Sequence, residues 1–272
     1  MEKKKLLFVG LPESGKTTYL AALWQLLNTS DSIFKIKNLN DDLNYLESIA
    51  ENWRDFETIP RTNDGNFKNE ISLQKSEGTI ELDLVIPDYK GEHFKNLLIK
   101  RSIDNELMNY INETDNIFLF ISYSDIENAV NWDDAQLDLT NKNQSGESYY
   151  KSSCTQARIT ELLQLINYLR EYKKINIVVL ITAWDLVPSL FSQDPTKFLT
   201  NNFPLFLQYL NSNKNFINFN IYGISSQGTS YDKTQDIEKL KKLSSEKRVK
   251  IVHSEDKKLD FLEPISWILK HQ

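Results

Sequence analysis

Apolar residues follow two different spacings that alternate along the chain. Runs of consecutive apolar residues, rich in β-branched and aromatic side chains, are typical of strands buried on both faces. They cover residues 6–9, 117–122 and 175–181, and the last clear strand is predicted at 219–224. Between these runs, apolar residues recur every three or four positions, as on one face of a helix. This spacing predicts helices after Lys16 and over residues 41–56, 94–111, 156–172, 195–210 and 259–269.

Residues 67–74 and 79–86 flank Ser76-Glu77-Gly78, and this pattern predicts an antiparallel hairpin. Residues 58–66 contain Pro60 and Gly65 and predict an exposed loop. Residues 123–153 are rich in Asn, Asp, Ser and Gln and are too long for a plain connection. The charged stretch 239–258 gives no clear prediction.

Alternation of strands and helices predicts a three-layer α/β fold, in which helices cover both faces of a mainly parallel sheet. We expect one domain over residues 1–272, extended by insertions at about 28–57 and 123–153. Ligands of such sheets bind beyond the carboxyl ends of the strands, so the loops that follow the strands are the place to look for chemistry.

The composition is that of a soluble globular protein, with 40% hydrophobic and 26% charged residues among 272. The net charge of -6 argues against non-specific binding of nucleic acid. The apolar runs are far too short to span a bilayer. Cys154 is the only cysteine and no signal peptide is evident, so we expect a reducing, cytoplasmic location.

The strongest motif follows the first strand. Residues 10–17, with the sequence GLPESGKT, match G-x-x-x-x-G-K-[ST], the phosphate-binding P-loop. Its glycines permit a tight turn whose backbone N–H groups face phosphate oxygens, and the following helix adds its N-terminal positive charge. Lys16 is expected to reach the β- and γ-phosphates, and the Thr17 hydroxyl to ligate Mg²⁺. The candidate phosphate contacts are Gly10, Glu13, Ser14, Gly15, Lys16, Thr17 and Thr18, although helix packing also explains Thr18.

Two further strands end in polar residues that suit a nucleotide. Asp88 follows residues 79–86, where P-loop proteins place the acid that holds Mg²⁺, and the Gly91 N–H can reach a γ-phosphate. An ordinary turn also explains this pair. Asp185 follows residues 175–181 and can accept hydrogen bonds from guanine N1–H and the exocyclic amine, or can simply cap a helix. Backbone N–H groups of Ser225 and Ser226 can contact the guanine carbonyl oxygen, or form a plain turn.

The order of these motifs resembles GTPase domains of the translation-factor-like (TRAFAC) class, which includes Ras-like proteins. The residues at the motif positions are most similar to those of bacterial double-GTPase (DO-GTPase) domains. The stretches that carry the resemblance are residues 10–23, 88–92, 182–186 and 263–269. The resemblance implies a Ras-like P-loop fold, GTP or GDP and Mg²⁺ as ligands, and work beside partner proteins in multi-component conflict or defence systems. It also implies that Thr62 ligates Mg²⁺ in a first switch and that Thr182 and Asp185 belong to the base-reading motif.

This chain departs from the family pattern at two positions. Ala183 replaces the lysine that normally packs along the base, and Trp184 either stacks on the base in its place or serves as a buried anchor. Glu92 replaces the glutamine that orients the attacking water. It either acts as a base, if a cation lies close, or is a solvated helix residue. Arg61 beside Thr62 either stabilises transition-state charge or is an exposed loop cation.

The sequence therefore predicts a Mg²⁺-dependent GTPase switch with a protein effector or activating partner. Ala183 and Glu92 leave open a module that binds nucleotide without hydrolysing it. An ATP-binding P-loop enzyme is the third hypothesis.

Overall fold

The computed structural model describes residues 3–29, 32–39, 43–59, 68–75, 81–87, 91–124, 126–127, 146–229, 233–255 and 259–271. Within them, eight strands form one sheet in the order β2-β3-β4-β1-β5-β6-β7-β8. The strands are β1 (Lys3–Gly10), β2 (Phe34–Leu39), β3 (Lys68–Lys75), β4 (Glu81–Pro87), β5 (Asn116–Ser122), β6 (Ile175–Thr182), β7 (Ile217–Ser225) and β8 (Lys250–Val252). Strands β4, β1, β5, β6 and β7 are parallel to one another.

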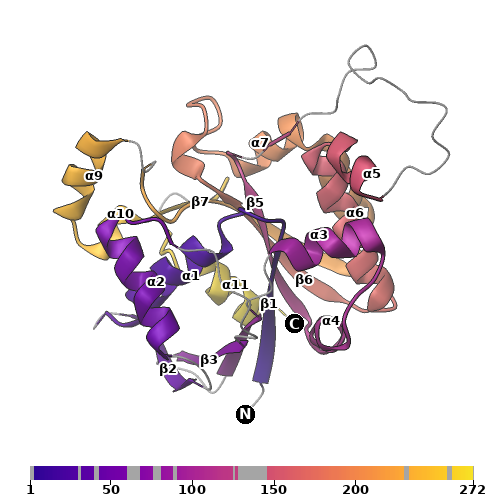
Figure 1. The fold of residues 1–272 in the computed structure, drawn as a ribbon, viewed down its shortest axis with the longest axis horizontal. Helices are drawn as coiled ribbons and strands as arrows, with labels where there is room; N and C mark the ends of the chain where they lie inside the picture. The colour runs from indigo at the N-terminus through magenta and orange to yellow at the C-terminus, as the bar shows by residue number, and fades with distance from the viewer. Residues whose placement is uncertain are drawn as a thin grey trace.

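The helices lie on both sides of this sheet (Figure 1). They are α1 (Lys16–Leu27), α2 (Leu43–Asp55), α3 (Gly91–Lys100), α4 (Asn105–Glu113), α5 (Gly146–Ser152), α6 (Thr155–Leu169), α7 (Pro195–Asn202), α8 (Pro204–Ser212), α9 (Thr234–Lys241), α10 (Ser245–Arg248) and α11 (Glu263–Lys270), with a 3₁₀ turn η1 (Trp184–Leu186). The predicted three-layer α/β fold, with helices on both faces of a mainly parallel sheet, is confirmed.

Alternate residues of the central strands point to opposite faces and divide the core in two. Leu6 and Phe8 of β1 pack with α1, α2 and α11, whereas Leu7 and Val9 pack with α3, α4, α6, α7 and α8. All residues of β5 are buried. Burying a large apolar side chain contributes about 1.5–3 kcal/mol, so both helix layers are needed to stabilise the parallel strands.

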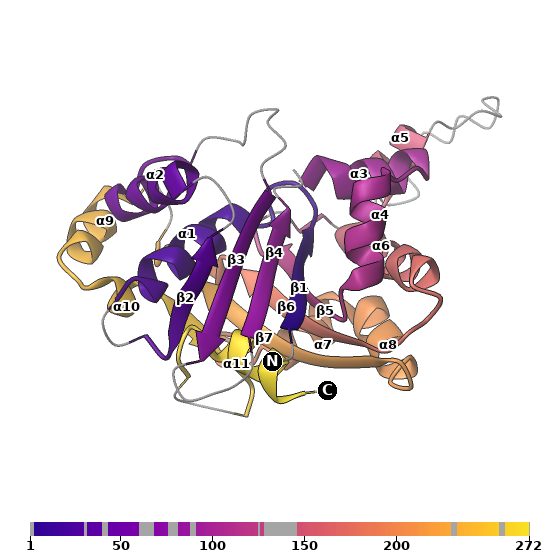
Figure 2. The same cartoon turned by 90° about the horizontal axis from the view of Figure 1, so that it is seen from below.

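The predicted hairpin is present, with β3 antiparallel to both β4 and β2. Figure 2 shows β2, β3, β4 and β1 side by side. The segment 28–57, which we predicted as an insertion, contributes β2 to the edge of the sheet and α2 to the layer over α1. It is therefore integrated in the core, with Trp53 fully buried.

Two predicted helices are each interrupted. The helix expected over 94–111 is wrong in its continuity, because Arg101 has a φ of 53° and Asp104 caps a new helix by accepting a hydrogen bond from Leu107 N at 2.7 Å. The helix expected over 195–210 ends before Phe203, and Pro204 begins α8. Proline lacks an N–H and is favoured in the first turn of a helix, where none is required.

The strand predicted at 219–224 is present as β7, and a further strand, β8, lies in the stretch 239–258, for which no clear prediction was possible. This strand pairs antiparallel with the end of β7, with Ile251 opposite Ile224. It has only three residues and lies in a charged stretch, so neither length nor alternation makes it visible in the sequence.

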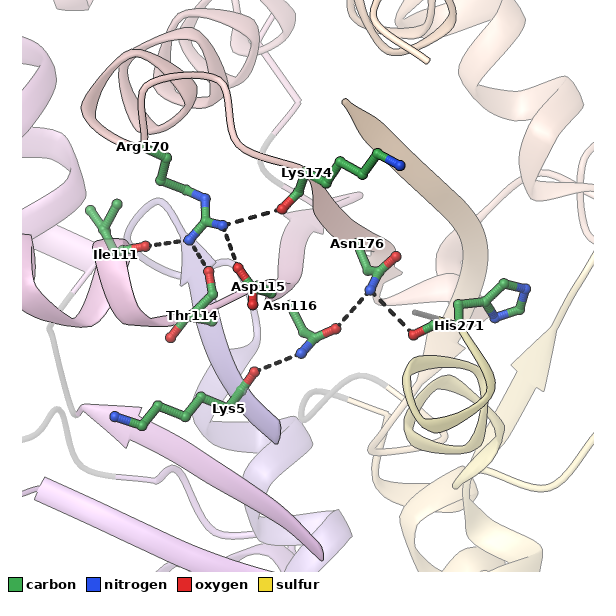
Figure 3. Close-up of polar contacts among 9 residues, drawn as sticks. All are labelled: Lys5, Ile111, Thr114, Asp115, Asn116, Arg170, Lys174, Asn176 and His271. Atoms are coloured by element: carbon green, nitrogen blue, oxygen red, sulfur yellow. Dashed lines mark hydrogen bonds and ion pairs between the residues drawn. The ribbon is translucent and has the colours of Figure 1, made fainter. Parts of the chain in front are cut away.

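A polar network closes the amino edge of the sheet, opposite the loops that follow the parallel strands (Figure 3). The Arg170 guanidinium, only 1% exposed, donates to the carbonyl oxygens of Ile111 at 2.6 Å and of Thr114, and to the Asp115 carboxylate at 2.7 Å. Asn116 and Asn176 lie opposite each other in β5 and β6 and join their side-chain amides at 2.9 Å. The network satisfies backbone carbonyls that end helix α4.

We expect Arg170→Ala to lower the free energy of unfolding by about 3 kcal/mol or more, because buried carbonyls lose their donor and a cavity remains. Urea unfolding followed by circular dichroism measures the change. Asp115→Asn is the matched control, since the Asp115 side chain is 75% exposed and should contribute less than about 1 kcal/mol. Equal losses in the two variants would contradict this account.

Candidate nucleotide-binding site

The parallel strands bring the predicted motifs to one edge of the sheet. Gly10 ends β1, Thr182 ends β6 and Ser225 ends β7, and these strands run in the same direction. The loops after the three strands therefore lie at the same edge, although more than 200 residues separate the first from the last. The sheet thus assembles a single candidate site from distant parts of the chain.

The phosphate loop is folded around Lys16. The Lys16 Nζ donates to the carbonyl oxygens of Gly10 and Leu11 and to the Ser14 hydroxyl, each at 2.9 Å. These contacts hold the ammonium group across the turn that leads into α1. The positive charge of Lys16 and the positive N-terminal end of α1 are thus directed to the same place, which fits a bound phosphate.

The backbone of this loop also explains its glycines. Gly15 has a φ of 84°, and a Cβ there would lie 2.9 Å from the Thr182 Oγ1. A Cβ on Gly10 would lie 2.5 Å from the Ser14 Oγ and 2.9 Å from the Phe120 carbonyl oxygen. Glu13 has a φ of 61°, which is unusual outside glycine. A closely approached backbone of this kind can present its N–H groups to a phosphate without obstruction.

The metal ligands predicted from the sequence are only partly described. Thr17 lies in the first turn of α1, beside Lys16, where a hydroxyl fits the Mg²⁺ of a bound nucleotide. Thr18 lies next to it on the same helix and is partly exposed. Arg61, Thr62 and Asp88 lie outside the described residues, so their roles stay predictions.

Helix α3 begins at Gly91, directly after the predicted Mg²⁺-binding segment, and Glu92 is in its first turn. The Glu92 carboxylate lies 3.6 Å from the Lys95 Nζ, one turn along the helix. Lys95 also lies over the Tyr150 ring, 5.6 Å from its centroid. Lys95 is therefore the cation that Glu92 needs nearby in order to act as a base. It was not predicted from the sequence, although its i,i+3 spacing from Glu92 is visible there.

A cavity of about 500 Å³ separates the phosphate loop from α3 and α6. Glu13, Glu92, Lys95, Tyr150 and Arg158 contribute to its wall. Arg158 is held by the Glu127 carboxylate at 2.6 Å and lies 4.3 Å from the centroid of Tyr150. Burial raises the pKa of Tyr150, which keeps its phenol neutral beside these charges. The cavity leaves open space beside Glu92.

The base-reading strand is tied to the phosphate loop. The Thr182 Oγ1 donates to the Ser14 carbonyl oxygen at 3.0 Å, and Thr182 is 5% exposed. Thr182 is thus buried against the phosphate loop and holds it through the Ser14 carbonyl oxygen. The sequence predicted Thr182 as part of the base-reading motif, and the structure places it between the phosphate and base segments.

Asp185 is exposed at the edge, in the turn η1 that follows β6. Its carboxylate accepts a hydrogen bond from the Ser225 hydroxyl at 2.6 Å, and the same hydroxyl accepts from the Gly228 N–H at 3.1 Å. Ser225 therefore joins the two predicted base-reading segments. This hydrogen bond fixes the position of the Asp185 carboxylate beside the loop 225–228.

Trp184 lies in the core and is 5% exposed. Its Nε1 donates to the Ser192 carbonyl oxygen at 3.0 Å, and its ring covers Gly223, where a Cβ would lie 2.2 Å from the indole. Of the two interpretations, this placement favours the buried anchor over stacking on a base. Ala183 adopts a φ of 53°, which turns the chain so that Trp184 points inward and Asp185 outward.

Comparison with protein-family models decides the family. The model described as Double-GTPase 1 matches residues 7–268, nearly the whole chain. The chain belongs to the Double-GTPase 1 family. The predicted resemblance to DO-GTPase domains is thus confirmed, and membership of this family supports binding of a guanine nucleotide.

Two other comparisons complete this picture. No curated protein gives a significant match to the sequence of this Double-GTPase 1 member. Among solved structures, it is similar to the Arl6 BBS3 small GTPase from Trypanosoma brucei with the nucleotide analogue GppNp bound, at 11% sequence identity and a TM-score of 0.41. That match covers 88% of this chain and 98% of the other. None of the described helices has the length and apolar character that crossing a bilayer requires.

We expect Thr182→Val to weaken binding of GTP and of GDP by roughly three- to tenfold, since a hydrogen bond of this kind contributes about 0.5–1.5 kcal/mol. Isothermal titration in the presence of Mg²⁺ measures both affinities. Thr160→Val is the control, because Thr160 is also 5% exposed and its hydroxyl donates to the Gln156 carbonyl oxygen within α6. Unchanged affinities in a folded Thr182→Val protein would show that the tether does not support the phosphate loop.

Proposed function

We propose that this Double-GTPase 1 protein is a Mg²⁺-dependent GTPase that works as a nucleotide-controlled switch. The observation that carries the proposal is the link between the two halves of the site. Thr182 ends the strand that precedes Asp185 and donates to Ser14 of the phosphate loop at 3.0 Å. One rigid edge therefore presents a phosphate cradle and a base-reading carboxylate together, as recognition of a whole guanine nucleotide requires.

Selectivity for guanine follows from the chemistry of Asp185. A carboxylate accepts hydrogen bonds only, and guanine offers N1–H and an exocyclic amine side by side. Adenine offers no such pair of donors. The bond from Ser225 orients the Asp185 carboxylate at 2.6 Å, and the backbone N–H groups of Ser225 and Ser226 are the proposed donors to the guanine carbonyl oxygen.

Mg²⁺ would be held by Thr17, with Thr62 and Asp88 as the further proposed ligands, and when bound it would neutralise charge on the β- and γ-phosphates. Lys16 would bind the same oxygens. In a switch of this kind, the segment around Thr62 and the segment from Asp88 to Glu92 become ordered on the γ-phosphate and are released after hydrolysis. Gly91, at the start of α3, would offer its N–H to the γ-phosphate.

Hydrolysis would proceed by attack of a water oxygen on the γ-phosphorus, which breaks its bond to the oxygen that bridges to the β-phosphate. The products are GDP and inorganic phosphate. Glu92 is the proposed acceptor of the water proton. The Lys95 ammonium at 3.6 Å supports this role, because it offsets the repulsion between a carboxylate and the phosphate. Arg61 is the proposed cation in cis for the charge that develops on the γ-phosphate.

An effector or activating protein is part of the proposal. The cavity of about 500 Å³ between the phosphate loop and α3 leaves room for a partner side chain beside Glu92. The resemblance to bacterial double-GTPase domains supports a place in a multi-component conflict or defence system. The lone Cys154 and the absence of a membrane-spanning helix among the described residues agree with the cytoplasmic location that we propose.

The first test is nucleotide competition. We expect GTP and GDP to compete with a fluorescent GTP analogue at least tenfold better than ATP and ADP, a difference of about 1.4 kcal/mol. Lys16→Ala should abolish binding, and Asp185→Asn should remove the preference for guanine while retaining the phosphate contacts. Equal competition by ATP would reject base reading by Asp185 and favour an ATP-binding P-loop protein.

The second test concerns Glu92. Phosphate release under single-turnover conditions should fall about 10²-fold or more in Glu92→Ala, because loss of a general base removes about 10²–10⁴-fold. Alanine is used because glutamine at this position is the residue with which Ras-like proteins orient the attacking water. GTP affinity should stay within about twofold.

Glu263→Ala is the matched control for Glu92→Ala. Glu263 also lies in the first turn of a helix and pairs with a lysine, Lys270, at 3.2 Å. Normal turnover in Glu92→Ala would make Glu92 a helix-terminal residue only. No turnover in the unmodified protein would favour a module that binds GTP without hydrolysing it.

A further inference from the structure

The base-reading loop, residues 225–228, is contacted from its other side by helix α2. The indole Nε1 of Trp53 donates to the Ser226 carbonyl oxygen at 2.7 Å. Trp53 is fully buried and lies 173 residues away in the sequence. It belongs to the segment that the sequence analysis treated as an insertion, outside the phosphate and base-reading motifs.

The Trp53 carbonyl oxygen accepts two further hydrogen bonds, one from the loop and one from α10. The Gln227 Nε2 donates to the Trp53 carbonyl oxygen at 3.3 Å, and the Arg248 Nη2 donates to it at 2.9 Å. The Arg248 guanidinium also lies 4.2 Å from the Trp53 ring centroid. These contacts bind the end of α2, the loop and α10 into one unit. In Figure 1 the ends of α2 and α10 lie next to each other.

The loop is thus held from two sides. Ser225 bonds to Asp185 on one side, and Ser226 bonds to Trp53 on the other. Gly228, with a φ of 88°, allows the chain to turn where the Arg248 carbonyl oxygen approaches, and a Cβ there would lie 2.7 Å from that oxygen. A loop held at both ends in this way has little freedom to adjust its backbone to a ligand.

Two side chains of the loop carry buried polar atoms. In the described structure, the Ser226 hydroxyl and the Gln227 amide oxygen are buried and have no hydrogen-bond partner. Ser226 is 6% exposed and Gln227 is 8% exposed. Leaving such a group unpaired costs about 1–3 kcal/mol, a cost that a nucleotide or an ordered water next to the loop can remove.

We propose that Trp53 is a positioning residue for guanine specificity. Its indole N–H fixes the Ser226 carbonyl and with it the Gln227 N–H of the same peptide plane. This restrains the adjoining Ser225 and Ser226 N–H groups, which are the proposed donors to the carbonyl oxygen of the base. Helix α2 thereby replaces part of the support that Ala183 cannot give, since alanine has no long side chain to pack along the base. The inference rests on base reading by Asp185 and the loop 225–228, as proposed above.

Trp53→Phe tests this proposal, because phenylalanine keeps an aromatic ring under Arg248 and removes the N–H donor. Affinities for GTP, ITP and ATP in Mg²⁺ are measured by competition. GTP and ITP both carry the carbonyl oxygen that the loop reads, whereas ATP does not. We expect the affinities of Trp53→Phe for GTP and for ITP both to fall by about tenfold, and its affinity for ATP to change by less than about twofold. The ratio of GTP to ATP affinity should therefore fall about tenfold.

Trp24→Phe is the matched control. Trp24 is 5% exposed in the same core cluster, on α1, and no hydrogen bond joins it to the described loop. General destabilisation of the core would lower the affinities for all three nucleotides alike and leave the ratio of GTP to ATP affinity unchanged. If Trp53→Phe does not fold, β-(3-benzothienyl)alanine at position 53 keeps the bicyclic shape and has sulfur in place of the N–H.

The possible results separate the two proposals. An unchanged GTP to ATP ratio in a folded position-53 variant, with a clear preference for GTP in the unmodified protein, overturns the role of Trp53 alone. No preference for GTP in the unmodified protein overturns base reading itself, and this inference with it. A tenfold fall in the ratio for position 53 but not for Trp24→Phe supports the proposal.

Discussion

Burial of the parallel strands on both faces is the constraint on which the other features of this protein depend. The central strands β1, β5 and β6 carry apolar residues at consecutive positions, and the two helix layers bury them almost completely. A strand that is apolar on both faces cannot pair in a sheet with one face exposed to water without losing much of that burial. Right-handed helical crossovers then bring all the carboxyl ends to one edge, which is where the loops with polar residues lie.

The site at that edge depends on contacts between loops as much as on the motifs themselves. Thr182 supports the phosphate loop through Ser14, and Ser225 orients Asp185. Each of these bonds joins segments that are far apart in the chain. These bonds hold the phosphate loop, the Thr182–Asp185 segment and the Ser225 loop in a fixed arrangement, which agrees with the proposed binding of a whole nucleotide. Lys16, bound to two carbonyl oxygens of its own loop, is oriented in the same rigid frame.

The segment 28–57 has a larger role than the word insertion suggests. It adds β2 to the sheet, packs α2 over α1, and through Trp53 reaches the base-reading loop. Residues from this segment thus contribute to the core and support a loop that follows the last parallel strand. In this way α2, which lies outside the predicted motifs in the sequence, supports the loop that carries Ser225 and Ser226.

The sequence by itself determined six of the eight described strands, the class of fold and the P-loop motif at residues 10–17. Local spacing is sufficient for these, because burial on both faces leaves a continuous apolar run and a P-loop needs glycine, lysine and threonine at fixed positions. The same local rules failed at Arg101 and Phe203, where a helical spacing continues across a break, and at β8, which is too short to show a pattern.

Only the tertiary structure decided how the candidate residues are used. Trp184 could stack or anchor on sequence grounds, and it packs on Gly223 in the core. Lys95 became relevant once it lay 3.6 Å from Glu92, and Trp53 once its indole met Ser226. Such contacts join residues up to 173 positions apart, and their partners are set by how the layers pack. A sequence pattern reports the chain's own neighbours, whereas specificity in this site depends on neighbours that only folding brings together.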